Sequence, residues 1–170
     1  MAGYGLPNEQ HLSVVLQNSL EVEGHNIEIV NGSVSGSTSA GGLNIAEWTL
    51  SENNIDLMIL CLGANDMLRG INPKETKNNL EEIIKIAKSK NIKIIIAGMI
   101  APTSYGYSYK KSFDKIFSDL SKKYKLQLIP FLLEGVAQKP EFNLSDGMHP
   151  NDQGTIIIGN TLKKAILENL

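Results

Sequence analysis

The sequence predicts an α/β protein, a three-layer α/β/α sandwich built on a parallel sheet. Short apolar runs typical of buried strands alternate along the chain with segments whose apolar residues recur at helical spacing. The 170 residues, 42% of them hydrophobic, suffice for one ordinary domain, and no repeat or low-complexity tract interrupts them. We therefore expect a single domain over residues 1–170, with helices covering both faces of its sheet.

The first half of the chain is expected to alternate helices and strands. A run at 27–30 has the composition of a strand, a loop rich in Gly and Ser occupies 31–39, and a helix is expected near 43–50. The apolar run 57–62 is typical of a strand buried on both faces, and it ends directly at Gly63. The opening helix is predicted from four apolar residues at helical spacing: Leu12, Val15, Leu16 and Leu20.

The strongest helix signal begins at residue 72. Asn72 is typical of an N-cap, Pro73 of a first helical turn, and Glu75 of the acidic partner in a capping box. The next residues make one apolar face, composed of Leu80, Ile83, Ile84 and Ala87. These features together predict a helix that starts at residue 73.

Two more strands and two more helices complete the predicted order. The runs 92–97 and 126–131 are expected to be strands, with a helix between them and another closing the chain. The apolar faces of these helices are Phe113, Ile116, Phe117 and Leu120 for the first, and Ile158, Leu162, Ala165 and Ile166 for the second. Because reactive groups in such sheets gather outside the carboxyl ends of the strands, the loops after the strands are expected to share a site.

Composition excludes several kinds of partner. A net charge of -2, from 16 basic and 18 acidic side chains without blocks, gives no footprint for nucleic acid or an anionic membrane. No apolar run approaches a membrane span, so no stable membrane insertion is expected, and no cationic-then-apolar leader opens the sequence. Cys61, the single cysteine, permits no internal disulfide and is expected to be a buried thiol.

Residues 146–149, Asp-Gly-Met-His, place a carboxylate three residues before an imidazole. Asp146 at this spacing can fix the tautomer of His149 and stabilise the imidazolium formed during catalysis. Taken alone, the pair is also compatible with a helix-capping Asp and a surface His. No second His, Cys or carboxylate stands at a metal-ligand spacing nearby, so we expect no metal.

Residues 63–66, Gly-Ala-Asn-Asp, come directly after the predicted strand at 57–62. The side-chain amide of Asn65 can donate to an oxygen at the sheet edge and stabilise developing negative charge, or it can complete an Asx-turn. Asp66 is expected to be structural and to bond backbone amides in that turn. The sequence therefore gives Asn65 a catalytic interpretation and Asp66 a supporting one.

The Gly/Ser-rich loop at 31–39 fits no familiar catalytic loop on its own. A nucleophile elbow needs serine between its flanking glycines, and Val34 holds the centre between Gly32 and Gly36. A phosphate loop needs Gly-Lys-Ser/Thr, and Gly41 is followed by another glycine. Without further context the loop is expected to be flexible.

The three fragments in order resemble the SGNH hydrolases, also called GDSL esterases and lipases. The loop 34–39 resembles the family's second block around Gly36, 63–66 its third block, and 146–149 its fifth, so the resemblance spans essentially the whole chain. Within the family, the local sequences of residues 62–70, 130–132 and 146–151 are similar to those of the bacterial arylesterase, acyl-CoA thioesterase and lysophospholipase branch. The resemblance implies a flavodoxin-like SGNH hydrolase fold.

The resemblance also assigns roles. It implies that His149 acts as general base and then acid, that Asp146 orients it, and that the Gly36 amide and the Asn65 side chain hold the oxyanion. Substrate contacts are expected from 67–71 and the loop 101–107, with these members foremost: Met67, Leu68, Arg69 and Tyr105. Arg69 is expected to touch an anionic head group or to form a salt bridge within its loop.

The nucleophile is the departure from the family pattern. In the family's first block, Gly-Asp-Ser-Leu is typically continued by residues like 2–6 of this chain, Ala-Gly-Tyr-Gly-Leu, which puts the serine two positions before Met1. The central strand that precedes this serine in the family, between the runs 27–30 and 57–62, is expected to be missing as well. We therefore expect an N-terminally truncated domain whose inner strand edges lack partners.

The resulting hypothesis is a serine ester hydrolase that needs no cofactor and acts on a small-molecule ester, thioester or lysophospholipid. The chain as written is expected to be inactive. The alternatives are a non-catalytic pseudoenzyme that binds an acyl or glycan ligand, and a flavodoxin-like binding domain, which rests on architecture alone. Members of this branch are often periplasmic or secreted, and any signal peptide would lie upstream of Met1.

Overall fold

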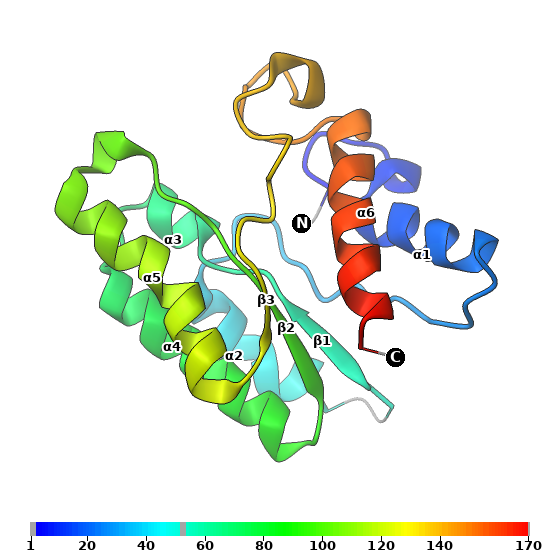
Figure 1. The fold of residues 1–170 in the computed structure, drawn as a ribbon, viewed down its shortest axis with the longest axis horizontal. Helices are drawn as coiled ribbons and strands as arrows, with labels where there is room; N and C mark the ends of the chain where they lie inside the picture. Colours follow the sequence, from blue (N-terminus) through cyan, green and yellow to red (C-terminus); the bar gives the residue numbers. More distant parts are fainter. Residues whose placement is uncertain (1–2, 52–53, 170) are drawn as a thin grey trace. The chain divides into compact units, whose positions relative to one another are not determined.

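The computed structural model describes residues 3–51 and 54–169 and divides into two compact units (Figure 1). One unit combines Met1–Ser35 with Leu132–Leu170, and we call it the terminal unit. The other is Gly36–Phe131, which we call the sheet unit. Residues 1 and 2, where the predicted first-block segment begins, lie outside the described residues. The single domain over 1–170 stays a prediction.

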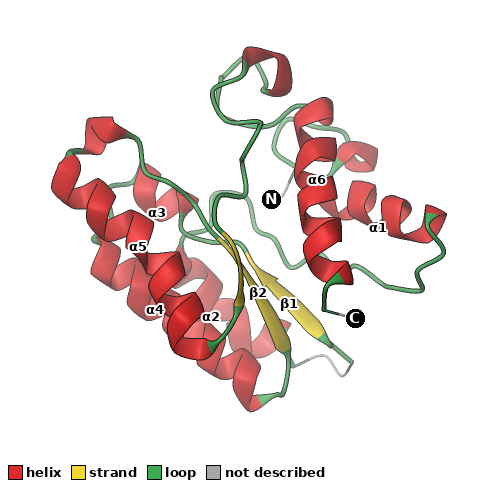
Figure 2. Ribbon diagram, in the orientation of Figure 1, coloured by secondary structure: helices red, strands yellow, loops and turns green. Residues whose placement is uncertain are grey.

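The sheet unit contains a three-stranded parallel sheet with helices beside it (Figure 2). The strands lie in the order β1 (Leu57–Leu60), β2 (Lys93–Ala97) and β3 (Gln127–Ile129), with Leu57 opposite Lys93 and Ile95 opposite Gln127. The helices of this unit are α2 (Ser39–Thr49), α3 (Ala64–Leu68), α4 (Pro73–Ser89) and α5 (Tyr107–Tyr124), with a 3-10 turn η2 at Thr103–Tyr105. The predicted α/β class with a parallel sheet is confirmed.

Helix α4 shows why the sequence forms these elements. The Asn72 side chain accepts from the amide of Lys74 at 3.0 Å, and Pro73 occupies the first turn, where its missing N–H costs nothing. The predicted apolar face enters the core, where Leu80 and Ile84 are fully buried. The helix predicted to start at residue 73 is therefore confirmed.

Gly63 is the N-cap of α3, three residues after the end of β1. Its φ of 114° lies in the left-handed region, and a Cβ there would stand 3.2 Å from the Phe117 ring, so only glycine fits without strain. The sharp turn places Asn65 in the first turn of α3. The expectation that 57–62 is buried on both faces was wrong, since β1 covers only Leu57–Leu60 and its first three residues are half-buried. The reason is that β1 stands at an edge of the described sheet.

The terminal unit packs α1 (Leu12–Val22) against α6 (Asp152–Leu167), a pairing that the sequence did not predict. Gly159 faces α1, and a Cβ there would make an ordinary van der Waals contact with Val15 at 3.5 Å. Lys163 and Glu23 add an ion pair between the two helices. The 3-10 turns η1 (Asn8–Gln10) and η3 (Pro140–Phe142) complete the unit. Both predicted helices are confirmed.

The predicted strand at 27–30 was wrong, because these residues belong to no strand. The Gln17 side chain of α1 donates to the carbonyl of Ile27 and accepts from the amide of Ile29, at 2.8 and 2.7 Å. A β-like composition becomes a strand only when another backbone pairs with it, and here a side-chain amide satisfies the same groups.

No helix within residues 3–51 and 54–169 is long and apolar enough to cross a membrane.

Candidate active site

The loop that carries Asp146 and His149 is tied at its base. Asn143 and Pro150 form an isolated antiparallel bridge, and the amide of Leu144 donates to the carbonyl of His149 at 2.7 Å. The Asn143 side chain is buried and donates to the carbonyls of Val136 and Lys139 at 2.8 and 2.7 Å. Because both ends of the loop are fixed, the side chains between them are held in a defined arrangement.

Asp146 and His149 form the contact expected from their spacing. Nδ1 of His149 lies 2.7 Å from Oδ2 of Asp146, and Oδ1 accepts from the amides of Met148 and His149 at 2.8 and 3.0 Å. These hydrogen bonds, led by the one from the His149 amide, lower the pKa of Asp146 to about 2. The carboxylate is therefore ionised at neutral pH. It favours the tautomer in which Nδ1 carries the proton and Nε2 is a free base.

Tyr4 contacts the imidazole, a contact that the sequence did not predict. The Tyr4 and His149 ring centroids lie 4.4 Å apart, with an angle of 33° between the planes. The His149 side chain nevertheless keeps 41% of its surface exposed, so a substrate can reach it. Tyr4 lies within the segment 2–6 that resembles part of the family's first block, but nothing in the spacing linked it to residue 149.

Helix α3 and its C-cap residue hold the loop at 36–39 by hydrogen bonds. Asn65 and Asp66 lie in the helix, and Arg69 caps its C-terminal end. The Asn65 side chain donates to the carbonyl of Ser37 at 3.0 Å, and Nη2 of Arg69 donates to the carbonyl of Gly36 at 2.9 Å. Asp66 accepts from the amide of Ser39 at 2.7 Å. The structure thus brings together both predicted oxyanion donors, Gly36 and Asn65, within the sheet unit. Arg69 thus bonds a backbone carbonyl, and its expected head-group contact stays a prediction.

Asp66 is structural, as predicted, but its partners differ from the expected turn amides. The carboxylate is 1% exposed and also accepts from the hydroxyls of Ser39 and Thr76, the latter at 3.1 Å. Asn79 donates in turn to the Ser39 hydroxyl at 3.0 Å. The network joins α2, α3 and α4. The sequence predicted no role for Ser39 or Thr76, because partners 27 and 10 residues away leave no pattern in local spacing.

The four predicted substrate contacts do not share one environment. Met67 is 7% exposed and belongs to the hydrophobic core, so we do not carry it into the site. Leu68 is 44% exposed, and its carbonyl lies 3.5 Å from the Tyr105 hydroxyl. Tyr105 and Tyr109 stack at 5.4 Å, and the Tyr109 hydroxyl donates to the carbonyl of Ile71 at 3.0 Å. Leu68 and Tyr105 therefore remain candidates for side chains that line a substrate pocket.

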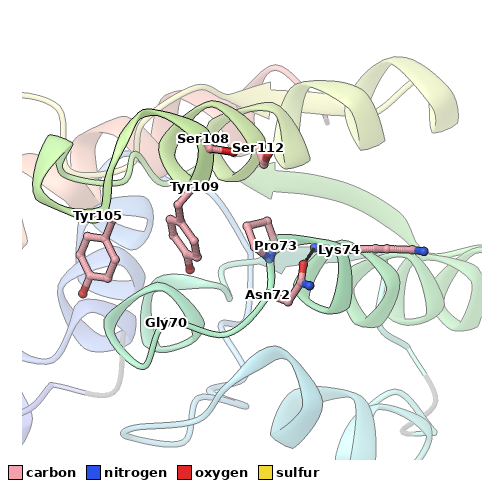
Figure 3. Close-up of a pocket in the computed structure, with 8 residues that line it drawn as sticks. All are labelled: Gly70, Asn72, Pro73, Lys74, Tyr105, Ser108, Tyr109 and Ser112. Carbon is pink, nitrogen blue, oxygen red and sulfur yellow. Dashed lines mark hydrogen bonds between the residues drawn. The ribbon is translucent and has the colours of Figure 1, made fainter.

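Tyr105 also lines an open groove of about 640 Å³ between the start of α5 and the chain that leads into α4 (Figure 3). The tyrosine rings project toward Gly70 and Pro73 in this view. The lining residues are Gly70, Asn72, Pro73, Lys74, Tyr105, Ser108, Tyr109 and Ser112. Desolvation raises the pKa of Tyr109, as expected for a ring that is partly enclosed there. The groove combines an aromatic wall with hydroxyl and amide groups.

Metal ligands do not cluster in the described part of the chain. No group of three His, Cys, Asp or Glu side chains there could hold a metal ion. Cys61 is only partly buried, although burial is sufficient to raise the pKa of its thiol.

The fold and these residues define a class, the SGNH carboxylic ester hydrolases. The chain belongs to the GDSL-like lipase/acylhydrolase family, whose model matches residues 1–155. It is 33% identical over 169 residues to an arylesterase of Vibrio mimicus, covering 99% of this chain and 84% of that protein.

Two further comparisons agree with this assignment. A thioesterase 1/protease 1/lysophospholipase L1 of Escherichia coli is 33% identical over 138 residues, which cover 81% of this chain and 66% of that protein. A crystal structure of TesA matches with a TM-score of 0.93 and 32% identity, covering 99% of this chain and 94% of that one. The resemblance to the arylesterase, thioesterase and lysophospholipase branch is confirmed.

The predicted catalytic and oxyanion residues fall into two pairs. Gly36 and Asn65 belong to the sheet unit, and Asp146 and His149 to the terminal unit. Convergence of the two pairs on one nucleophile stays a prediction.

Proposed function

We propose that this chain carries the proton-transferring and oxyanion-binding groups of a serine ester hydrolase that works through an acyl-enzyme. The single observation that carries the proposal is the 2.7 Å contact between Nδ1 of His149 and an ionised Asp146. This arrangement leaves Nε2 as the proton acceptor that a serine hydroxyl requires.

In the proposed reaction, Nε2 of His149 takes the proton of the serine hydroxyl while the serine oxygen attacks the carbonyl carbon. The imidazolium then gives this proton to the leaving alcohol or thiol as the bond to the carbonyl carbon breaks. Water attacks the acyl-enzyme, gives its proton to the same nitrogen, and the serine recovers a proton as the acid leaves. Asp146 stays ionised throughout and stabilises the imidazolium.

The oxyanion donors are the Gly36 amide and the Asn65 side chain, with the amide of the serine itself as a third. One N–H of the Asn65 amide is committed to the carbonyl of Ser37. A carboxamide has two N–H donors, so the second remains for the substrate oxygen. Each such donor is worth roughly 3 kcal/mol of barrier.

The proposed substrate is a small ester, thioester or lysophospholipid. The names of the relatives, arylesterase and thioesterase 1/lysophospholipase L1, support this class. Leu68 and Tyr105 are proposed to contact the substrate, because Leu68 is exposed at the last residue of the helix that carries Asn65 and the Tyr105 hydroxyl lies beside its carbonyl. No cofactor takes part in the proposed reaction.

We place the nucleophile outside residues 1–170, two positions before Met1, and expect the 170-residue chain alone to turn over no ester. The test is a fluorophosphonate probe followed by mass spectrometry of the purified chain. No stoichiometric label is expected at any serine, including residues 33, 35, 37 and 39 of the loop. A stoichiometric label, or ester turnover that disappears in His149→Ala, would contradict this proposal.

A chain extended at its N-terminus tests the catalytic roles directly. The added segment is the strand and Gly-Asp-Ser block of a relative, joined so that its serine stands two positions before residue 1. We expect ester turnover that His149→Ala abolishes, with the same extension carrying Ala for the serine as the control. A folded extended chain that binds an ester without hydrolysing it would favour the non-catalytic pseudoenzyme instead.

A further inference from the structure

Gly36 has little around it that fixes its conformation. Its φ of 73° lies in the left-handed region, and residues 31–36 are all exposed. A Cβ at this position would meet only Nη2 of Arg69 within 4 Å, at 3.9 Å, so packing does not hold the backbone in place. An oxyanion donor, by contrast, must point at a fixed position before the reaction starts.

Arg69 provides the bond that packing does not. Its Nη2 donates to the carbonyl of Gly36 at 2.9 Å, from the residue that caps the C-terminal end of α3. The same short helix anchors the next residues of the loop, through Asn65 to Ser37 and through the buried Asp66 to Ser39. Arg69 therefore ties the Gly36 backbone to the end of α3, the helix that carries Asn65, the second proposed oxyanion donor.

We propose that Arg69 is a positioning residue for the oxyanion hole, acting through the Gly36 carbonyl to fix the direction of the Gly36 amide. The inference rests on the proposed function, in which Gly36 is an oxyanion donor. With the carbonyl held, the dihedral angles on both sides of the Gly36 Cα are restricted, and the amide and Asn65 keep a constant spacing. A guanidinium suits this task because its donors form a rigid, permanently charged fork.

The competing role for Arg69 is the recognition of an anionic head group. The two roles predict different kinetics. A positioning residue acts on every substrate, including a neutral ester, and its loss lowers kcat with little change in KM. A head-group contact acts only on anionic substrates, and its loss raises KM for them.

The first test uses the 170-residue chain itself. We compare Arg69→Met, which keeps an unbranched apolar stem and removes the hydrogen-bond donors, with Lys115→Met, which removes a positive charge from the exposed side of α5. In Arg69→Met the ¹⁵N order parameter of the Gly36 amide is expected to fall from about 0.85 to below about 0.6. Arg69→Lys, which restores one donor, is expected to recover part of it. An unchanged Gly36 amide in Arg69→Met, or an equal change in Lys115→Met, would overturn the proposal.

The second test uses the serine-extended protein and a neutral short-chain ester. For Arg69→Met we expect kcat to fall about 10- to 100-fold with KM within about twofold, and partial rescue by Arg69→Lys. An unchanged kcat would overturn the positioning role. If the extended protein has no His149-dependent activity at all, the proposed function fails, and the Gly36 order parameter still decides whether Arg69 fixes this backbone.

Discussion

At the scale of single residues, the site depends on groups whose partners lie at different distances along the chain. Asp146 and His149 are three residues apart, and their contact was predictable from spacing because one short loop contains both. The contact of Tyr4 with His149 joins residues 145 positions apart and left no signal. The predicted substrate role of Met67 rested on its neighbours in sequence, whereas α3 turns this side chain into the core.

The pH dependence of the 146–149 loop follows from the hydrogen bonds to Asp146. Its folded pKa of about 2 lies below the ordinary value of 3.8, so the ionised form favours the folded loop. The stabilisation is fully present above pH 3.8 and is lost as the pH falls through the folded pKa. We expect the amide shifts of Met148 and His149 to titrate with a midpoint near 2.

The matched variant for this titration is Asp146→Asn. It should abolish the low-pH transition at both amides. It should also remove the preference of His149 for the tautomer with the proton on Nδ1, which the ¹⁵N shifts of the imidazole measure. A midpoint near 3.8 in the unmodified chain would contradict the inferred stabilisation of the carboxylate.

At the scale of elements, local signals predicted the α-helices other than α3 and most of the strands. Residue 72 and the apolar face after it defined α4, because capping and helical periodicity are local properties. The strand prediction for 27–30 was wrong because a strand depends on a partner backbone that no local pattern reveals. The Gln17 side chain instead bonds backbone groups of this segment. The support that α3 and its C-cap Arg69 give to the 36–39 loop left no local pattern either, since these bonds span 27 to 33 residues.

The junction of α2, α3 and α4 should depend on the Asp66 carboxylate. In Asp66→Ala the amide of Ser39 and the hydroxyl of Thr76 lose their acceptor in a buried place, at a cost of about 1–3 kcal/mol for each unsatisfied group. We expect the free energy of unfolding in urea to fall by about 3 kcal/mol.

Asp119→Ala is the control for this variant, because Asp119 makes an exposed ion pair with Lys77 on the same unit. Its loss should cost below about 1 kcal/mol. Equal destabilisation by the two substitutions would show that Asp66 is not a junction of the fold.

At the scale of the whole molecule, the edge strand β1 of the described sheet is open to a further partner. In the described residues, β2 has a strand on each side, whereas β1 pairs with β2 alone. The apolar sequence of β1 is typical of an inner strand, yet its first three residues are only half-buried. An apolar edge strand of this kind presents unpaired N–H and C=O groups to any backbone that can reach it. The family resemblance supplies a candidate for that backbone, a strand preceding residue 1, which stays a prediction.

Hydrogen exchange of β1 tests this candidate. In the 170-residue chain, alternate amides of β1 lack a strand partner and should exchange faster than those of β2, which has a strand on each side. In the serine-extended protein the added strand should pair with β1, and the fast amides should slow by about fivefold or more, since each new bond contributes about 1 kcal/mol. The control carries the same extension with proline at a central strand position, which removes the donor and disfavours pairing. Protection of β1 that is equal in all three proteins would mean that this edge is already covered, and that the added strand does not belong beside it.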